Sequence, residues 1–136
     1  MIGLDTNVLV RYISQDDPIQ SEKANALFES LSTGLEAYVT VVSLVELVWV
    51  LSSCYGSSKA EISNVLESLM HTKYIIVQDA DIVWKALRNF KEGKADFPDC
   101  LIKHTSFNAG CSSVVTFDVK AARDSGMSLI GSESIK

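Results

Sequence analysis

Short apolar runs alternate with longer amphipathic segments along this chain, a pattern typical of strands that alternate with helices. The opening residues Met1 to Leu4 form such an apolar run, and the acid Asp5 ends it. Apolar residues then recur at helical spacing from Val8 to Ile13, which predicts a helix directly after the first strand. The same pattern predicts strands in residues 37–41, 74–77, 113–116 and 128–130, and helices after the turn at 16–18, in residues 43–51, 58–70, 79–90 and 120–123, and from the 96–99 segment through 108.

This order of elements predicts an α/β fold of three layers, α/β/α, with a mostly parallel sheet of four to five strands. A length of 136 residues with 47% hydrophobic residues suits one domain, which we expect to span residues 1–136. The longest apolar stretch, Val39 to Leu51, is interrupted by polar residues and is too short for a bilayer span. We therefore expect a cytoplasmic protein without a membrane segment. The three cysteines lack Cys-x-x-Cys spacing and indicate neither a disulfide framework nor a zinc site.

Four carboxylates that lie far apart in the sequence carry the candidate chemistry. Asp5 directly follows the first predicted strand and Asp118 follows another by two residues. Both should emerge at the C-terminal edge of the sheet, where open α/β sheets bind ligands. Glu46 is the only charge in residues 40–51, and burial of a lone carboxylate is costly unless a partner such as a cation compensates it. Asp99 stands at the start of a predicted helix whose N-terminus could lie over the same edge.

Each acid also has a purely structural interpretation, which is preferred when a position is taken singly. Asp5 and Asp118 are suitable N-caps, and both Ser43-x-x-Glu46 and Asp96-x-x-Asp99 have capping-box spacing. The two roles are compatible, because a cap also places its side chain at the end of an element. Several acids at one edge, with no obvious set of Arg or Lys partners, favour a cation site. Oxygen-only ligands suit Mg²⁺ or Mn²⁺, for which phosphodiester hydrolysis is the natural chemistry.

The net charge of −5 argues superficially against a nucleic-acid partner, because Lys and Arg supply much of the affinity for phosphate. If the four acids form one site, however, the rest of the chain carries a net charge of only −1. A bound divalent cation would also bring the site itself toward neutrality. The composition is therefore compatible with a nucleic-acid substrate.

Four short segments follow one another along nearly the whole chain: Leu4-Asp5-Thr6-Asn7, Ser43-x-x-Glu46-Leu-x-Trp49-Val-Leu, Ala95-Asp96-Phe-Pro-Asp99-x-Leu-Ile, and Val115-Thr116-Phe-Asp118. As a set they resemble the four motifs of the PIN-domain family, specifically of the VapC-type toxins. The resemblance implies a Mg²⁺-dependent endoribonuclease that is commonly a homodimer. It also implies inhibition by a co-expressed VapB-type antitoxin, whose C-terminal segment occupies the active-site groove.

The resemblance assigns roles to individual positions. Asp5 and Asp99 would be the principal metal ligands, Asp118 a further ligand directly or through water, and Glu46 the residue that completes the acidic cluster. A supporting set would donate hydrogen bonds to the carboxylates or to the scissile phosphate: Thr6, Asn7 and Thr116.

Two positions near the third motif have open assignments. Either Asp96 or Asp99 could cap the helix while the other binds metal. We favour Asp99 as the ligand because the family's acid lies three residues before the Ile of this helix, here Ile102. Relatives often carry small residues after this acid, where this chain has Lys103 and His104. Lys103 either contacts phosphate or is simply solvated.

Basic residues at helical intervals lead toward Asp96 and form either a phosphate track or an ordinary soluble helix face: Lys85, Arg88, Lys91 and Lys94. We expect core or interface packing rather than base stacking for Trp49 and Trp84. The two histidines have no second histidine at ligand spacing, which disfavours zinc. The alternatives to an RNA-cleaving toxin are a non-toxin PIN-like nuclease for other RNA or for DNA, and a catalytically silent partner-binding module.

Overall fold

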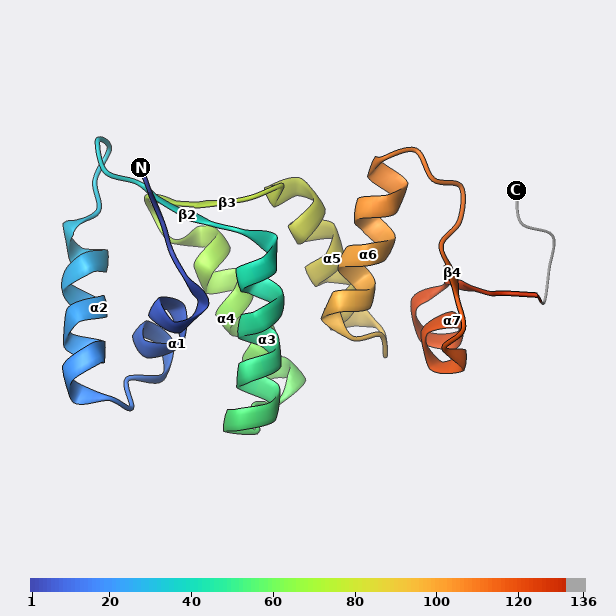
Figure 1. Cartoon of the computed structure of the whole chain (residues 1–136), viewed down its shortest axis with the longest axis horizontal. Coiled ribbons are helices and arrows are strands. Elements are labelled where there is room, and N and C mark those ends of the chain that lie inside the picture. The colour runs from blue at the N-terminus through green and yellow to red at the C-terminus, as the bar shows by residue number, and fades with distance from the viewer. Residues whose placement is uncertain (132–136) are drawn as a thin grey trace. The chain divides into compact units, whose positions relative to one another are not determined.

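The computed structural model describes residues 1–131, and the chain forms two compact units, Met1–Ala80 and Asp81–Lys136 (Figure 1). The first unit contains β1 (Ile2–Gly3), α1 (Thr6–Ser14), α2 (Pro18–Ser30), β2 (Ala37–Val39), α3 (Val41–Tyr55), α4 (Lys59–His71) and β3 (Ile75–Val77). The second unit contains α5 (Ala80–Glu92), whose first residue belongs to the first unit, followed by α6 (Phe97–Asn108), β4 (Val115–Thr116), α7 (Val119–Ser125) and β5 (Ser128–Leu129).

A parallel sheet in the order β1-β2-β3 forms the centre of the first unit. Ile2 pairs with Ala37, and Ala37 pairs with Ile75. Because the three strands are parallel, their C-terminal ends lie at one edge of this sheet, where Asp5 and Thr40 follow β1 and β2. Helix α1 packs against α2 and α3, and α4 packs against β3. Fully buried aliphatic side chains fill this core, including Leu9, Val39, Leu44, Leu47 and Leu66.

The second unit is held together by aromatic and aliphatic packing around α5 and α6. The rings of Phe90 and Phe97 pack edge to face at 5.9 Å between centroids, and Phe97 is completely buried. Strands β4 and β5 pair in parallel, with Val115 opposite Ser128, and α7 connects them. This unit therefore has its own small core and its own two-stranded sheet.

Side-chain caps determine where most of the helices begin. Asp17 caps α2 and is followed by Pro18 at the first helical position, where the missing N–H removes no helical hydrogen bond. Ser58 and Glu61 form a reciprocal capping box at the start of α4. Thr40 caps α3 by accepting a hydrogen bond from the Ser43 N–H. Helix α3 consequently begins at Val41, and the expected start at Ser43 is wrong by two residues.

The structure confirms the predicted α/β class but not the predicted sheet. We expected one sheet of four to five strands, whereas the main sheet has three and two further strands pair with each other in the second unit. Strand-forming patterns identify segments that need a hydrogen-bonding partner, but they do not specify which partner each segment takes. Within residues 1–131, no helix is long and apolar enough to cross a membrane.

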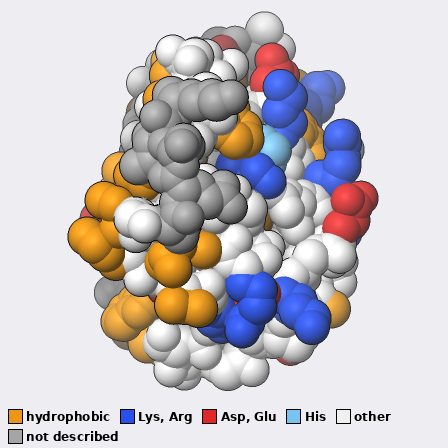
Figure 2. Space-filling model, turned by 90° about the vertical axis from the view of Figure 1, so that its right-hand side faces the viewer, with side chains coloured by type: hydrophobic (Ala, Val, Ile, Leu, Met, Phe, Trp, Pro, Cys, Tyr) orange, Lys and Arg blue, Asp and Glu red, His pale blue; other side chains and the backbone are white. Residues whose placement is uncertain are grey.

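One face of the molecule carries hydrophobic and basic side chains in separate places (Figure 2). Figure 2 shows a face on which hydrophobic side chains gather on one side and Lys and Arg side chains on the other. Several large apolar side chains are well exposed, among them Trp49 at 64% and Phe117 at 83%. Trp49 therefore does not pack in the core of the described residues, and its packing in an interface stays a prediction.

We expect Thr40→Ala to lower the free energy of unfolding by about 1 kcal/mol, because the Ser43 N–H at the start of α3 loses its acceptor. Urea unfolding followed by circular dichroism measures this change. Thr40→Ser should retain most of the stability, and Thr33→Ala, at an exposed loop position, serves as the matched control. Equal losses in Thr40→Ala and Thr40→Ser would show that the cap is not the cause.

Candidate active site

Asp5 and Glu46 line the same groove in the first unit. Asp5 leaves β1 and caps α1, with its Oδ1 accepting a hydrogen bond of 2.8 Å from the Thr6 N–H. Glu46 comes from α3, which packs against α1. Thr6 and Asn7 line the groove as well, and its volume is about 460 Å³. The structure therefore brings together two of the predicted acids with two of the predicted supporting residues.

Glu46 is exposed, contrary to the expectation that it is a buried carboxylate. Helix α3 directs Leu44, Leu47 and Leu51 into the core, and Glu46 lies on a different face of the helix. A carboxylate in contact with water needs no cation to be tolerated. The argument that Glu46 requires a partner is therefore wrong, although its place in the groove beside Asp5 agrees with the predicted acidic cluster.

Thr6 contributes a buried polar atom that is not satisfied. Its side chain is 7% exposed, and Oγ1 has no hydrogen-bond partner within residues 1–131. A buried hydroxyl without a partner costs about 1–3 kcal/mol, so such atoms usually meet water or a ligand. Thr6 lines the groove between Asp5 and Asn7, but its hydroxyl oxygen is itself buried.

Arg11 is a lining residue of this groove that the sequence reasoning missed. Its Nε donates to Gln20 Oε1 at 2.7 Å and its Nη1 donates to Asp16 Oδ1 at 3.1 Å. Tyr55 donates its hydroxyl to the other oxygen of Asp16 at 2.6 Å. Hydrogen bonds from Ser14 and Tyr55 lower the pKa of Asp16 to about 2, so this carboxylate stays ionised. A fixed guanidinium thus lies in the groove that contains Asp5 and Glu46.

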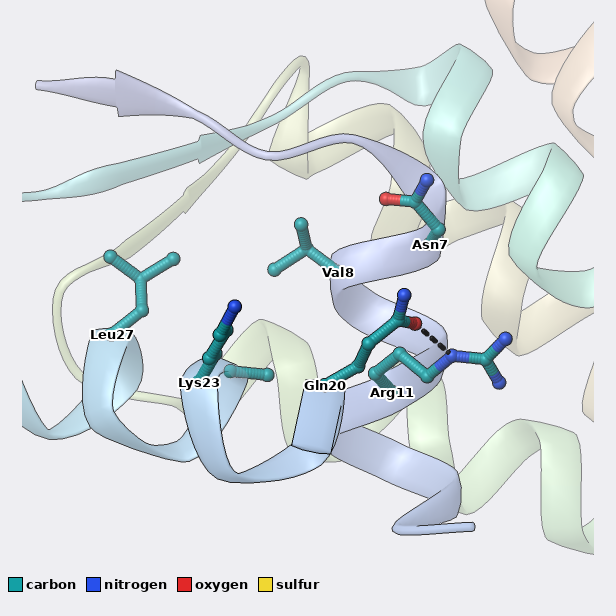
Figure 3. A pocket seen from close by; sticks show the side chains of 7 residues that line it. Asn7, Val8, Arg11, Gln20, Lys23 and Leu27 are labelled. Atoms are coloured by element: carbon teal, nitrogen blue, oxygen red, sulfur yellow. Dashed lines mark hydrogen bonds between the residues drawn. The ribbon is translucent and has the colours of Figure 1, made fainter. Parts of the chain in front are cut away.

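A neighbouring hollow of about 300 Å³ lies between α1 and α2 and shares Asn7 and Arg11 with the groove. Figure 3 shows Lys23 and Leu27 on α2 facing Val8 on α1, with the Arg11 to Gln20 hydrogen bond at one end. This hollow has mainly apolar walls with two basic side chains at its margin. It extends the surface that leads away from Asp5.

The second unit holds the other acids, and here Asp96 is the helix cap. Its Oδ1 accepts a hydrogen bond of 3.1 Å from the Asp99 N–H, which starts α6. Asp99 sits half-buried in the first turn and does not act as the cap. The structure thus answers the capping half of the question left open between Asp96 and Asp99.

Asp118 and Asp99 interact electrostatically within this unit. Burial raises the pKa of Asp99 first, followed by the charge of Asp96, a hydrogen bond with Asp96 and the charge of Asp118, while Lys120 opposes the rise. Asp118 caps α7 by accepting the Lys120 N–H at 2.8 Å. The second unit therefore has a set of mutually repelling carboxylates, which is the electrostatic condition that favours a bound cation.

Two predicted supporting residues of the second unit have structural contacts. Thr116 accepts the Asp118 N–H on its Oγ1 at 3.0 Å, so it positions the Asp118 backbone. The ammonium of Lys103 lies 3.5 Å from where a Cβ on Gly126 would be, next to the C-terminal end of α7. The partial negative charge at a helix C-terminus favours a cation there. Lys103 is half-buried with its ammonium beside Gly126, and its contact with phosphate stays a prediction.

Each unit thus carries its own part of the predicted acidic set. Asp5 and Glu46 share a groove in the first unit, and Asp99 interacts with Asp118 in the second. Within the described part of either unit, no three His, Cys, Asp or Glu side chains are close enough to hold a metal ion. Cys54, Cys100 and Cys111 form no disulfide within residues 1–131.

Comparison with known proteins gives two matches. The family model described as PIN domain matches residues 2–124. The chain is also similar to a VapC ribonuclease of Aquifex aeolicus (strain VF5), with 27% identity over 115 residues that cover 84% of each chain.

We expect Asp99→Asn to raise the Tm of the metal-free protein slightly at neutral pH. The pKa of Asp99 is higher in the folded protein than in the unfolded chain, so the folded state binds more protons between the two values. Stability therefore falls as pH rises through that interval, and the substitution removes the penalty. The gain should be full above the raised pKa and should vanish below the ordinary pKa of 3.8.

Thermal unfolding at several pH values checks this difference. Asp124→Asn is the control of opposite sign, because hydrogen bonding to Arg123 lowers the pKa of Asp124. It should not raise the Tm at neutral pH. A Tm that falls in Asp99→Asn, or a gain that is the same at every pH, would contradict the electrostatic explanation.

Proposed function

This chain belongs to the PIN domain family, and from this membership we propose that it is a Mg²⁺-dependent endoribonuclease that acts as the toxin of a type II toxin–antitoxin pair. The observation that carries the proposal is the groove in which Asp5 and Glu46, from two different elements, lie with Thr6 and Asn7. The similarity to a protein named VapC ribonuclease supports RNA as the substrate and a VapB-type antitoxin as the partner.

The side chains available to a cation are carboxylates, which suit Mg²⁺ and also Mn²⁺. The repulsion that raises the pKa of Asp99 supports this fit, because a cation would relieve it. We assign Asp5, Asp99 and Asp118 as its ligands. Asp5 and Asp118 each use Oδ1 for capping, and their Oδ2 atoms have no hydrogen bond within residues 1–131. A cation bound by these acids would polarise a phosphodiester and lower the pKa of an attacking water.

The protein's own groups position the substrate and the water. Glu46 forms no hydrogen bond or ion pair in the described chain, so its carboxylate is free to orient a water and accept its proton. Asn7 offers an amide to a phosphate oxygen in the groove, and Thr6 supports the Asp5 end of the groove from its buried position. Arg11 keeps its Nη2 free of hydrogen bonds within residues 1–131 and supplies positive charge on the same wall. Thr116 holds the backbone of the Asp118 loop, and Lys103 is available to contact phosphate.

Exposed apolar side chains on α3 of the first unit form a surface that suits the expected protein partners. Trp49 and Val42 on α3 are 64% and 67% exposed, and large apolar side chains at such exposure favour burial by another chain. We therefore keep the homodimer and the antitoxin complex as part of the proposal. A soluble, cytoplasmic location belongs to the same proposal.

We expect the purified protein, free of antitoxin, to cleave RNA with Mg²⁺ and to lose cleavage in EDTA. Asp5→Asn and Asp99→Asn should each reduce kcat/KM more than roughly 10- to 100-fold. That range is typical when a residue is replaced that only hydrogen-bonds to a metal ligand. Asn is a good N-cap, so Asp5→Asn should keep α1 intact. Asp17→Asn is the matched control, because Asp17 caps α2 in the same way and does not line the groove.

Cleavage that survives EDTA, or that persists in both variants, would refute the metal-dependent mechanism. Cleavage of DNA but not of RNA would refute the substrate class alone. Absence of any cleavage in the wild-type protein would favour a silent partner-binding module.

A second comparison separates the cap from the ligand at the start of α6. Asp96→Asn should keep most of the activity, because Asn can still accept the Asp99 N–H, whereas Asp99→Asn should abolish it. Cleavage rates and Mg²⁺ titrations of the two variants measure the difference. The reverse ranking would make Asp96 the ligand.

A further inference from the structure

A basic hollow of about 300 Å³ lies on the second unit, and Lys103 is the one lining residue that also belongs to the predicted supporting set. Six side chains of α5 and α6 line it: Lys85, Arg88, Asn89, Glu92, Lys103 and His104. Figure 2 shows Lys and Arg side chains gathered beside a histidine on one face. Three of these side chains are cationic and one is acidic, so the hollow carries a net positive charge. The whole chain has the opposite balance, because 17 acidic residues outnumber 12 basic ones.

The cations of this hollow are not engaged in ion pairs within the described residues. Lys85, Arg88 and Lys103 form no ion pair with any carboxylate in residues 1–131, although Glu92 lines the same hollow. Like charges placed together repel, so an unpaired basic cluster lowers the stability of the fold as long as no anion is bound. Such a cluster is therefore suited to attract an anion. Lys85 and Arg88 are three positions apart on α5, about one helical turn, and can therefore contact two phosphates of one strand.

A histidine and an asparagine join the two helices beneath these cations. His104 Nε2 lies 3.2 Å from Asn89 Oδ1 and connects α6 to α5. Burial lowers the pKa of His104 first, followed by the charges of Lys103 and Lys85, which favours the neutral imidazole. A neutral imidazole and an arginine guanidinium are flat surfaces on which unpaired RNA bases stack. This combination fits a nucleic acid better than an acidic peptide, which offers carboxylates but no bases.

We propose that this basic hollow binds the phosphate backbone of single-stranded RNA, through Lys85, Arg88 and Lys103 around His104. The inference rests on the proposed function, since it takes RNA as the substrate. The hollow contains no paired acids that could bind a catalytic cation, so it supplies affinity and not chemistry. Loss of its cations should raise KM and leave kcat nearly unchanged.

The structure also limits the basic surface suggested by the sequence. Lys91 and Lys94 continue the spacing of Lys85 and Arg88 but do not line the hollow. The charge of Lys94 instead helps to lower the pKa of Asp124, because α5 ends at Glu92 and the chain turns away. These two lysines therefore provide a control pair with the same charge in the same segment.

The test measures binding of a fluorescein-labelled single-stranded RNA of mixed sequence in EDTA, where no cleavage is expected. In the double variant Lys85→Ala/Arg88→Ala, Kd should rise about tenfold at 0.1 M salt, equivalent to about 1.4 kcal/mol. The slope of log K against log salt should fall by about 1.4, or roughly 0.7 for each lost phosphate contact. Lys91→Ala/Lys94→Ala should change Kd less than about twofold and leave the slope unchanged.

Equal losses in the two double variants would overturn the proposal, because the effect would then be one of net charge. Competition by polyglutamate at the same charge concentration as RNA would overturn it as well. Cleavage assays with Mg²⁺ separate this inference from the proposed function. If the wild-type protein cleaves RNA and Lys85→Ala/Arg88→Ala has an unchanged KM, the proposed RNA binding by the hollow is refuted and the proposed nuclease function is not. If RNA binds through the hollow but no cleavage occurs, only the proposed nuclease function is refuted.

Discussion

Helix capping is the interaction on which the candidate site depends. Asp5 and Asp118 each follow a strand, and each accepts a backbone N–H of the next helix on Oδ1. The cap fixes the backbone and the side chain together, because a displaced carboxylate would leave helical N–H groups without an acceptor. The second oxygen of each acid has no hydrogen bond within residues 1–131, so it is available to a ligand. One interaction thus starts the helix and orients the acid that we assign to catalysis.

The sequence predicted those features that depend on local patterns. The apolar runs at 37–41 and 74–77 became β2 and β3, and the acids expected at strand exits lie there. Partner choice was not predictable, because β4 pairs with β5 through contacts that no single segment encodes. The exposure of Glu46 was also not predicted. Residues 40–51 are apolar on average, and an average does not show that one face of α3 is exposed to solvent. The sequence alone did not decide between Asp96 and Asp99 as the cap, whereas the hydrogen bond from the Asp99 N–H to Asp96 identifies Asp96.

The residues that the sequence reasoning missed belong to networks that join distant segments. Arg11, Asp16 and Tyr55 come from the end of α1, the following turn and the end of α3, and only the packing of these elements brings them together. Asn89 and His104 meet in the same way between α5 and α6. A polar residue inside an apolar helical pattern, such as Arg11 between Val10 and Tyr12, is the one local signal that could have indicated a buried network or a site.

Charge distribution explains how an acidic chain can accept a polyanion. Salt screens the effect of the net charge at distances beyond about 8 Å. Phosphate groups in contact with the protein respond instead to the local electrostatic potential. The unneutralised cations of the basic hollow raise that potential on α5 and α6, and Arg11 does so in the groove of the first unit. The remaining repulsion comes from the acids themselves. A bound divalent cation would cancel this repulsion, so metal binding and RNA binding would each favour the other.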